Sequence, residues 1–237
     1  MEFKRSLINK NYIFTFISVA LCFVLGYILL ISIDEVPMSE ITIKLLFESV
    51  YTVFTQFGML IFPIIIIMSF NIDYKEKNIL FYELLDISEI KYFLSKLLVS
   101  VFLYTLSIFI MNTVVCLYYK DFSDFFIMFL HYESVILCFI TIVSVLSFLF
   151  NNLIAVFCLN LFLWIGSIVL STAIPKLSLL SYYDASNKLY ENIHKYIETS
   201  NTKYLSLGES FFYDLVVLFL GINIIMIFKK RWKKNGI

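Results

Sequence analysis

The sequence predicts an all-α membrane protein with six transmembrane helices and both termini in the cytoplasm. Of its 237 residues, 61% are hydrophobic and only 15% are charged, and the mean hydropathy of +0.90 is far above that of soluble proteins. Several apolar runs approach the roughly 20 residues that a helix needs to cross a bilayer core about 30 Å thick. Strands of a membrane barrel would alternate apolar and polar residues, and these runs are apolar on every face. We therefore expect one transmembrane domain over residues 1–237.

Six stretches are predicted to span the membrane, and the first three contain no charged side chain, which would be costly at mid-bilayer. The predicted spans are residues 12–33, 49–70, 97–119, 134–150, 153–174 and 211–228. The fourth span starts at Ser134 unless the apolar run 125–130 extends it, which would bring His131 and Glu133 to the membrane. All four cysteines lie inside these spans, so neither a disulfide framework nor a metal site is expected.

Polar residues inside the spans are few. Pro63 should kink the second span and leave one backbone carbonyl without its usual donor. Gln56, Asn112, Asn160 and Asn223 are expected to form hydrogen bonds between helices, as is usual for such side chains in membranes.

Basic residues set the orientation. With a cytoplasmic N-terminus, the outer segments hold only Lys44, Lys120, Lys176, Lys188, Lys195 and Lys203, and the other twelve Lys and Arg lie inside. The 18 basic and 18 acidic residues cancel, so no nucleic-acid partner is indicated. The abundance of Ile, Phe, Asn, Lys and Tyr suggests an AT-rich bacterial genome, and hence a bacterial cell membrane.

The cytoplasmic stretch 71–96 combines charged residues with an apolar spine. Ile79, Leu80 and Leu84 belong to a three-to-four residue spacing that predicts a short amphipathic helix. Ser88 can cap a second helix that runs directly into the third span. A solvated connector would suit the charges, but connectors are commonly short and exposed leucines would leave an apolar patch in water. We therefore favour a docking surface.

These features, in this order, resemble the permease subunits of type-2 ABC exporters, especially those of bacteriocin or lantibiotic immunity and antimicrobial-peptide export. The resemblance rests on two spans, a charged run, Leu84-Leu85, a turn at Ser88 and a helix that reaches Lys96. In that family the loop forms a coupling helix that inserts into a cytosolic ATPase, beside an amphipathic connecting helix. By resemblance, the coupling residues are Asp73, Glu76, Ile79, Leu80, Glu83, Leu84 and Leu85, and those of the connecting helix are Ser88, Phe93 and Lys96.

The resemblance implies a permease subunit that exports a peptide or another hydrophobic or amphipathic substrate, for antimicrobial-peptide export or self-immunity. Two cytosolic ABC ATPase subunits would bind ATP and Mg, and this chain would bind no cofactor. The expected further partners are a second permease copy, or a related permease, and membrane lipid.

Three other segments are predicted to hold structure. The extracellular loop 171–210 contains Leu189, Ile193 and Ile197 at four-residue spacing, so Ser186 or Asn187 can start a surface helix there. Residues 1–11 can form an interfacial helix before the first span. The cationic run 229–234 fits stop-transfer anchoring at the inner leaflet.

An enzymatic role finds no support in the sequence. None of the six glycines is followed by Lys, so the phosphate loop of an ATPase is missing. His131 and His194 lie in different segments and cannot form a His-Glu-x-x-His zinc site. The main alternative is a membrane immunity or sensor protein that works without an ATPase and binds a toxin through the outer loop.

Overall fold

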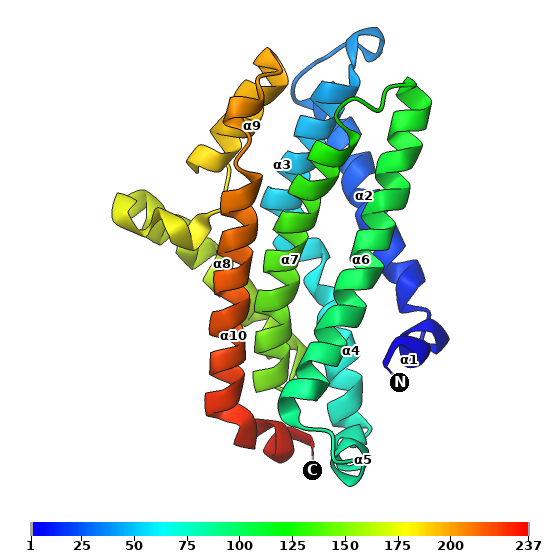
Figure 1. Ribbon diagram of the computed structural model, residues 1–237, viewed down its shortest axis with the longest axis vertical. Helices are drawn as coiled ribbons and strands as arrows, with labels where there is room; N and C mark the ends of the chain where they lie inside the picture. The colour runs from blue at the N-terminus through cyan, green and yellow to red at the C-terminus, as the bar shows by residue number, and fades with distance from the viewer. Residues whose placement is uncertain (1, 237) are drawn as a thin grey trace.

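The computed structural model describes residues 2–236 and arranges them as an elongated bundle of helices (Figure 1). Each regular element within these residues is a helix. The long elements are α2 (Asn11–Ser32), α3 (Ile43–Ile61), α4 (Pro63–Lys75), α6 (Glu89–Tyr119), α7 (Phe125–Leu149), α8 (Leu153–Ala173) and α10 (Leu207–Gly236). The short ones are α1 (Glu2–Ile8), η1 (Met38–Glu40), α5 (Asn78–Leu84), η2 (Pro175–Ser181), α9 (Lys188–Thr199) and η3 (Thr202–Tyr204).

The prediction of six membrane-crossing helices is confirmed, with α3 and α4 together forming one crossing. The fourth helix follows the longer alternative, because α7 begins at Phe125 and carries His131 and Glu133 within it. Both side chains are buried against neighbouring helices, at 1% and 8% exposure. The predicted start of this span at Ser134 is therefore wrong, and the alternative that includes the apolar run 125–130 is confirmed.

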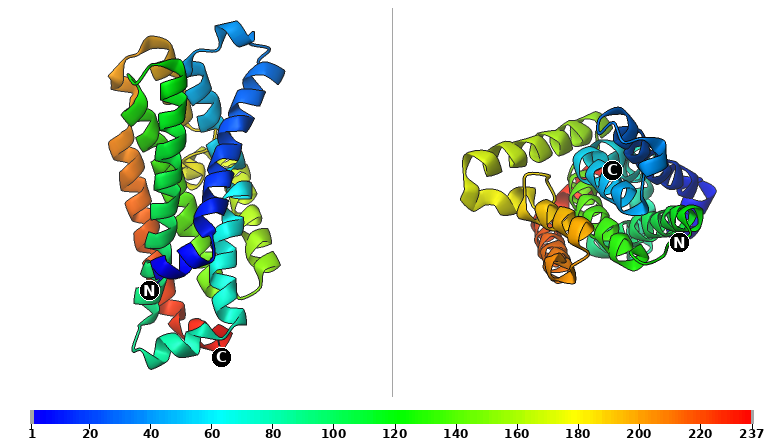
Figure 2. Two further views of the ribbon diagram at one scale, coloured as in Figure 1. Left: turned by 90° about the vertical axis from the view of Figure 1, so that its right-hand side faces the viewer. Right: turned by 90° about the horizontal axis from the view of Figure 1, so that it is seen from above.

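The core lies along α7, which the other spans surround (Figures 1 and 2). In its most apolar stretch 83% of the residues are buried, against 11% in α8. At mid-height, Phe54 packs on Tyr132 with ring centroids 4.9 Å apart and on Phe62 at 5.3 Å. Such aromatic contacts supply much of the buried surface.

Pro63 breaks the second crossing into α3 and α4, as predicted. A proline has no N–H, so the carbonyl of Met59 four residues earlier loses its helical donor. Asn160 of α8 replaces that donor, with its Nδ2 3.0 Å from the Met59 oxygen. Tyr104 of α6 donates its hydroxyl to the Phe62 carbonyl at 3.1 Å. Two neighbouring helices thus complete the hydrogen bonding at the break.

The other polar residues of the spans divide into two groups. Asn112 bonds between helices as expected, through Nδ2 to the Phe125 carbonyl at 3.0 Å. Gln56 and Asn223 instead bond within their own helices, to Thr55 and to the Phe219 carbonyl, so the expectation is wrong for them. A single turn of helix offers these side chains a nearby partner, which competes with any partner on another helix.

A close contact joins α2 and α3. A Cβ on Gly26 would lie 2.7 Å from Val50 Cγ2 and 2.9 Å from the Val50 nitrogen. Ser49 donates its hydroxyl to the Gly26 carbonyl at 2.8 Å. A small residue is needed here because the two backbones almost touch.

The two ends of the bundle differ, and we name them after their short helices (Figure 1). The α5 end carries α1, α5 and both chain termini. The α9 end carries α9, which begins after Asn187; the Asn187 Oδ1 atom caps the helix by accepting a hydrogen bond from the Leu189 nitrogen at 3.4 Å. The predicted start of that helix is confirmed. Its apolar residues Leu189 and Ile193 are buried, at 4% and 1% exposure.

Candidate functional site at the α5 end

The candidate site is built around α5, the predicted short amphipathic helix between the second and third crossings. Lys77 precedes α5 and Asp86 follows it. Both residues have a left-handed backbone conformation, with φ of 56° and 51°. These two turns isolate α5 from α4 and α6 and confirm the expected interruption. Ser88 then caps α6 by accepting a hydrogen bond from the Lys91 nitrogen at 3.3 Å, as predicted.

One face of α5 is buried and the other is exposed. Ile79 and Tyr82 are 0% and 3% exposed. Leu84 is 83% exposed, the highest value among the large hydrophobic residues of the described chain. Leu80, Phe81 and Leu85 are also exposed, which makes one apolar patch at the far end of the bundle. We call these four residues the α5 patch. Apolar patches of this kind mark contact surfaces.

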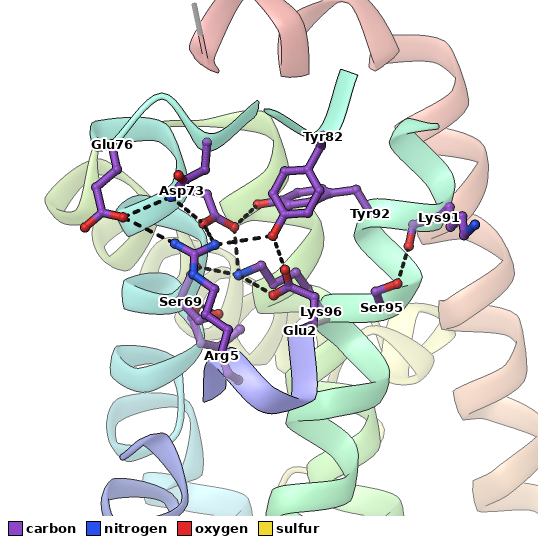
Figure 3. Close-up of polar contacts among 12 residues, drawn as sticks. Glu2, Arg5, Ser69, Asp73, Glu76, Tyr82, Lys91, Tyr92, Ser95 and Lys96 are labelled. Atoms are coloured by element: carbon purple, nitrogen blue, oxygen red, sulfur yellow. Dashed lines mark hydrogen bonds and ion pairs between the residues drawn. The ribbon is translucent and has the colours of Figure 1, made fainter. Parts of the chain in front are cut away.

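Beneath the α5 patch lies a buried ion cluster of two acidic and two basic residues (Figure 3). Asp73, at the end of α4, is 0% exposed and pairs with both Arg5 of α1 and Lys96 of α6. The Lys96 Nζ atom lies 2.7 Å from Asp73 Oδ2 and 2.8 Å from Glu2 Oε2. The charges cancel, which is the condition for keeping such groups out of water.

Two tyrosines connect this cluster to α5 and α6. Tyr92 donates its hydroxyl to Asp73 Oδ2 at 3.0 Å, and Tyr82 donates to Glu2. Burial raises the pKa of Tyr82, and the carboxylates of Asp73 and Glu2 raise it further, so its hydroxyl remains a donor at neutral pH. The two rings meet edge to face at 5.0 Å.

Arg5 extends the cluster to the surface. Its NH2 group lies 3.3 Å from Glu76 Oε2, and the same carboxylate accepts from Asn78 Nδ2 at 2.9 Å. Burial works to lower the pKa of Arg5, but the charge and hydrogen bond of Asp73 outweigh it and raise that pKa. The guanidinium therefore stays charged, and α1 is held to both α4 and the start of α5.

The last turns of α10 complete the site from the other side. The helix bends at Phe228, where φ is −100° and ψ is 17°. This bend brings Trp232 against Tyr92, with ring centroids 5.3 Å apart, and Trp232 is 1% exposed. Lys233 Nζ reaches Glu83 Oε1 on α5 at 2.9 Å. The run 229–234, predicted as a membrane anchor, thus also contacts α5.

The residues predicted for ATPase coupling and for the connecting helix fall into three groups in the structure: exposed, buried and intermediate. Leu80, Leu84 and Leu85 face outward, as a docking role requires. Asp73, Ile79, Phe93 and Lys96 are buried within the chain and cannot touch a partner in this conformation. Glu76 and Glu83 lie between the two groups, tied to Arg5 and Lys233. The docking role of the whole set stays a prediction.

Sequence reasoning missed the contributions of Glu2, Arg5, Tyr92 and Trp232. A signal for the first two was available, because positions 2 and 5 are one turn apart and place opposite charges on one face of a short apolar helix. Tyr92 and Trp232 carried no such signal. Their contact with each other depends on the bend of α10 at Phe228, which no residue type in that stretch predicts.

Comparison with known proteins agrees with this architecture. The sequence model of the peptide export permease protein YydJ family matches residues 1–237. The chain is 32% identical over 244 residues to the probable peptide export permease protein YydJ of Bacillus subtilis (strain 168), and the match covers 100% of this chain and 99% of the relative. No solved structure matches the chain. The chain therefore belongs to the peptide export permease protein YydJ family.

Proposed function

We propose that this permease is the membrane-spanning subunit of an ATP-driven peptide exporter, and that a separate ABC ATPase binds the α5 patch. The permease itself would bind no nucleotide, and the ATPase subunits would hold ATP and Mg. The α5 end would face the cytoplasm, which the excess of Lys and Arg in that end supports. The substrate would be a peptide, including an antimicrobial peptide that the cell exports for release or for its own protection.

The observation that carries this proposal is the combination of an exposed α5 patch with a rigid attachment. Leu84 is 83% exposed, yet α5 is fixed to two other helices, through Tyr82 to α1 and through Glu83 to α10. A docking element that transmits force needs both properties. A free connector would have neither an ordered apolar patch nor buried ties.

Force applied to α5 would pass into the bundle through the buried ion cluster. Asp73 lies in the last turn of α4, and Lys96 lies in the third turn of α6, the helix that makes the third crossing. A push on α5 would therefore move α4, α6 and α1 together against α7. The break at Pro63 lets α4 move while α3 stays packed. For ATP to drive this motion, the ATPase must contact α5 differently in its two states.

The alternative of a toxin-binding immunity or sensor protein requires a free surface on the outer loop. The apolar face of α9 is instead packed against α3. Tyr196 and Ile197 are 3% and 7% exposed, and Tyr196 donates its hydroxyl to Asp124 at 2.5 Å. What α9 leaves exposed is polar, so α9 offers less for a toxin than the α5 patch offers for an ATPase. The exposed leucines of this loop, Leu179 and Leu180, lie instead in η2, which packs beside α8.

The test uses the double variant Leu84→Asp with Leu85→Asp. Its partner is sought among the proteins encoded beside this chain, as one that carries a Walker A loop and an LSGGQ-type signature. We expect the unaltered permease to co-purify with that ATPase and the variant to lose it, because two carboxylates cannot enter an apolar cleft. Thermal unfolding in detergent should change little, since both leucines are exposed.

Lys77→Asp serves as the matched control. It adds an acidic residue to the other end of the same segment and removes no apolar contact, and aspartate tolerates the left-handed backbone at that position. Retention of the ATPase by the Leu84/Leu85 variant, together with undiminished export, would contradict the proposal.

A further inference from the structure

Two carboxyl groups are buried in the membrane-spanning part of the bundle without a cation beside them. Glu133 of α7 and Asp214 of α10 are 8% and 7% exposed, and neither forms an ion pair in the described part of the chain. Asp73 shows the usual arrangement of a buried carboxylate, because Arg5, Lys96 and a tyrosine hydroxyl surround it. A negative charge at membrane depth without such partners is costly. Glu133 and Asp214 therefore need another means of neutralisation.

Glu133 has very few hydrogen-bond donors around it. The hydroxyl of Thr105 on α6 lies 2.5 Å from Glu133 Oε1. The other carboxyl oxygen, Oε2, has no partner among the described residues and is closed off from solvent. The spanning part of α6, residues 97–119, carries no charged side chain. A buried carboxylate has about four acceptor positions to satisfy, so a single donor cannot hold its charge here.

The hydroxyl of Thr105 has only one proton, and a second acceptor competes for it. Thr105 Oγ1 lies 2.9 Å from the Val101 carbonyl, one turn earlier in α6. Threonines in helices commonly donate to that carbonyl. The short contact with Glu133 then needs a proton from the glutamate, and a carboxylic acid supplies it by donating an O–H from Oε1 to Thr105 Oγ1. What remains unpaired is a neutral carbonyl oxygen, which costs far less than an unpaired charge.

The surroundings of Glu133 also oppose a charge. Asp214 lies near enough to interact with it electrostatically, and Asp214 itself has one donor, the Tyr183 hydroxyl at 2.8 Å from its Oδ1. Ionising both carboxyls would place two like charges in a region of low dielectric constant. His131 lies two residues from Glu133, on the opposite side of α7, where its ring meets Tyr51 of α3 at 6.1 Å. A bound proton on Glu133 removes this repulsion.

The contact between Glu133 and Thr105 crosses the boundary between α7 and α6. In the proposed function, a push on α5 moves α6 with α4 and α1 against α7, so the stroke would separate these two side chains. Glu133 lies eight residues after the start of α7, or about 12 Å from that start at the α9 end of the bundle. A proton that leaves Glu133 therefore has its shorter way out toward the α9 end.

We propose that Glu133 is a proton-binding site between α6 and α7. While the two helices are packed, Glu133 holds the proton and donates its O–H to Thr105. When α6 moves away, the O–H bond breaks and the proton passes to water at the α9 end; when the helices pack again, Glu133 takes one proton back. The release step rests on the proposed function, whereas the bound proton belongs to this conformation alone. Acid at the α9 end would then favour the packed helices.

Infrared spectroscopy of the full-length permease at neutral pH measures the bound proton. The protein is held in dodecyl maltoside, because this detergent has no carbonyl group. A carboxylic acid gives a C=O stretching band well separated from the bands of a carboxylate. Labelling the side-chain carboxyl of glutamate with ¹³C, and subtracting the unlabelled spectrum, separates Glu133 from Asp214.

We expect one glutamic acid band in the unaltered chain, and its loss in Glu133→Gln. The matched variant Glu76→Gln should keep the band, since the Glu76 side chain is 62% exposed and ionised. Thr105→Val should move the band to higher frequency, because the acid loses its acceptor, and Thr105→Ser should leave it in place. Absence of the band in the unaltered chain, its survival in Glu133→Gln, or an unmoved band in Thr105→Val would overturn the proposal. If Glu133→Gln does not fold, the unaltered chain and the two Thr105 variants decide.

The release step is followed with a pH-indicator dye in weakly buffered detergent solution. A non-hydrolysable ATP analogue is added to the permease with its co-purified ATPase, because hydrolysis would itself release protons. We expect release of about one proton per permease, and none from Glu133→Gln. Equal signals from both proteins would overturn the release step. Loss of the ATPase partner with the infrared band intact would contradict the proposed function alone, and an intact complex without the band would contradict this inference alone.

Discussion

Asp73 is the residue on which most of the α5 end depends. Its carboxylate meets Arg5, Lys96 and Tyr92, which come from α1 and from α6. We expect Asp73→Asn to lower the free energy of unfolding by about 3 kcal/mol, because it leaves two cations with a single buried carboxylate. Thermal unfolding in detergent measures this. Glu76→Gln is the control, since the Glu76 side chain is 62% exposed and should matter by less than about 0.5 kcal/mol.

His194 makes the attachment of α9 depend on pH. Its hydrogen bond to Glu48 raises the pKa of the imidazole, with Glu198 adding to the effect and burial and Lys195 opposing it. The stabilisation is therefore complete below the unfolded pKa of about 6.5 and is lost as pH rises through the higher folded pKa. Because the His194 side chain is half-exposed, this stabilisation amounts to less than about 1 kcal/mol. Hydrogen exchange of α9 amides, corrected for intrinsic rates, should accelerate as the pH rises above about 6.5. His194→Gln should remove that dependence, and an unchanged dependence in this variant would contradict the assignment.

Among the elements, the contact of α2 with α3 depends on the absence of one side chain. Gly26→Ala places a methyl group within 3 Å of the Val50 backbone, so we expect a loss of about 1–3 kcal/mol in unfolding free energy. Gly166→Ala on α8 is the matched control, because no heavy atom lies within 4 Å of its Cβ position. That variant should be unchanged or more stable by up to about 1 kcal/mol. Equal losses in both variants would show that helix packing is not the cause.

The break between α3 and α4 is tested by a double-mutant cycle. Asn160→Leu removes the donor to Met59 O and should cost about 1–3 kcal/mol. Pro63→Ala restores the N–H at position 63, which can bond the same carbonyl within the helix. In that background Asn160→Leu should cost about 1 kcal/mol less, as measured by unfolding of the four proteins. Additive losses would mean that the two residues act independently.

The helices themselves were largely predictable, because long uncharged runs leave little choice of structure. Pro63 predicted the break between α3 and α4. Ser88 predicted the start of α6, and Asn187 was one of the two residues predicted to start α9. The longer α7 was harder, since His131 and Glu133 interrupt its apolar pattern and only the burial by neighbouring helices explains them. Gln56 and Asn223 show the same limit. A sequence shows that a side chain needs a partner, but not which helix provides it.

At the scale of the whole molecule, the two ends should lie on opposite sides of the membrane. Lys75 at the α5 end and Lys188 at the α9 end are both exposed. In intact cells, a membrane-impermeant maleimide should label Lys188→Cys at once and Lys75→Cys only after permeabilisation. The unaltered chain gives the background from its four native thiols. Labelling of Lys75→Cys in intact cells would reverse the orientation and remove the basis for ATPase docking.

The candidate site was predictable in its exposed half only. Leu84 and Leu85 stood out as leucines in a charged segment, whereas the buried ion cluster unites residues 2, 5, 73 and 96, which no short motif contains. Sequence patterns describe what one helix presents, and this cluster arises where several helices meet.

The ion cluster also bears on how the protein is made. Glu2 and Arg5 emerge from the ribosome before their partners, Asp73 and Lys96. The amino-terminal helix thus cannot reach its final position until the third crossing has been synthesised, and its charges must meanwhile remain hydrated at the membrane surface. Completion of the cluster then becomes a late step of biogenesis, and a nascent chain truncated before Lys96 would keep its first helix undocked.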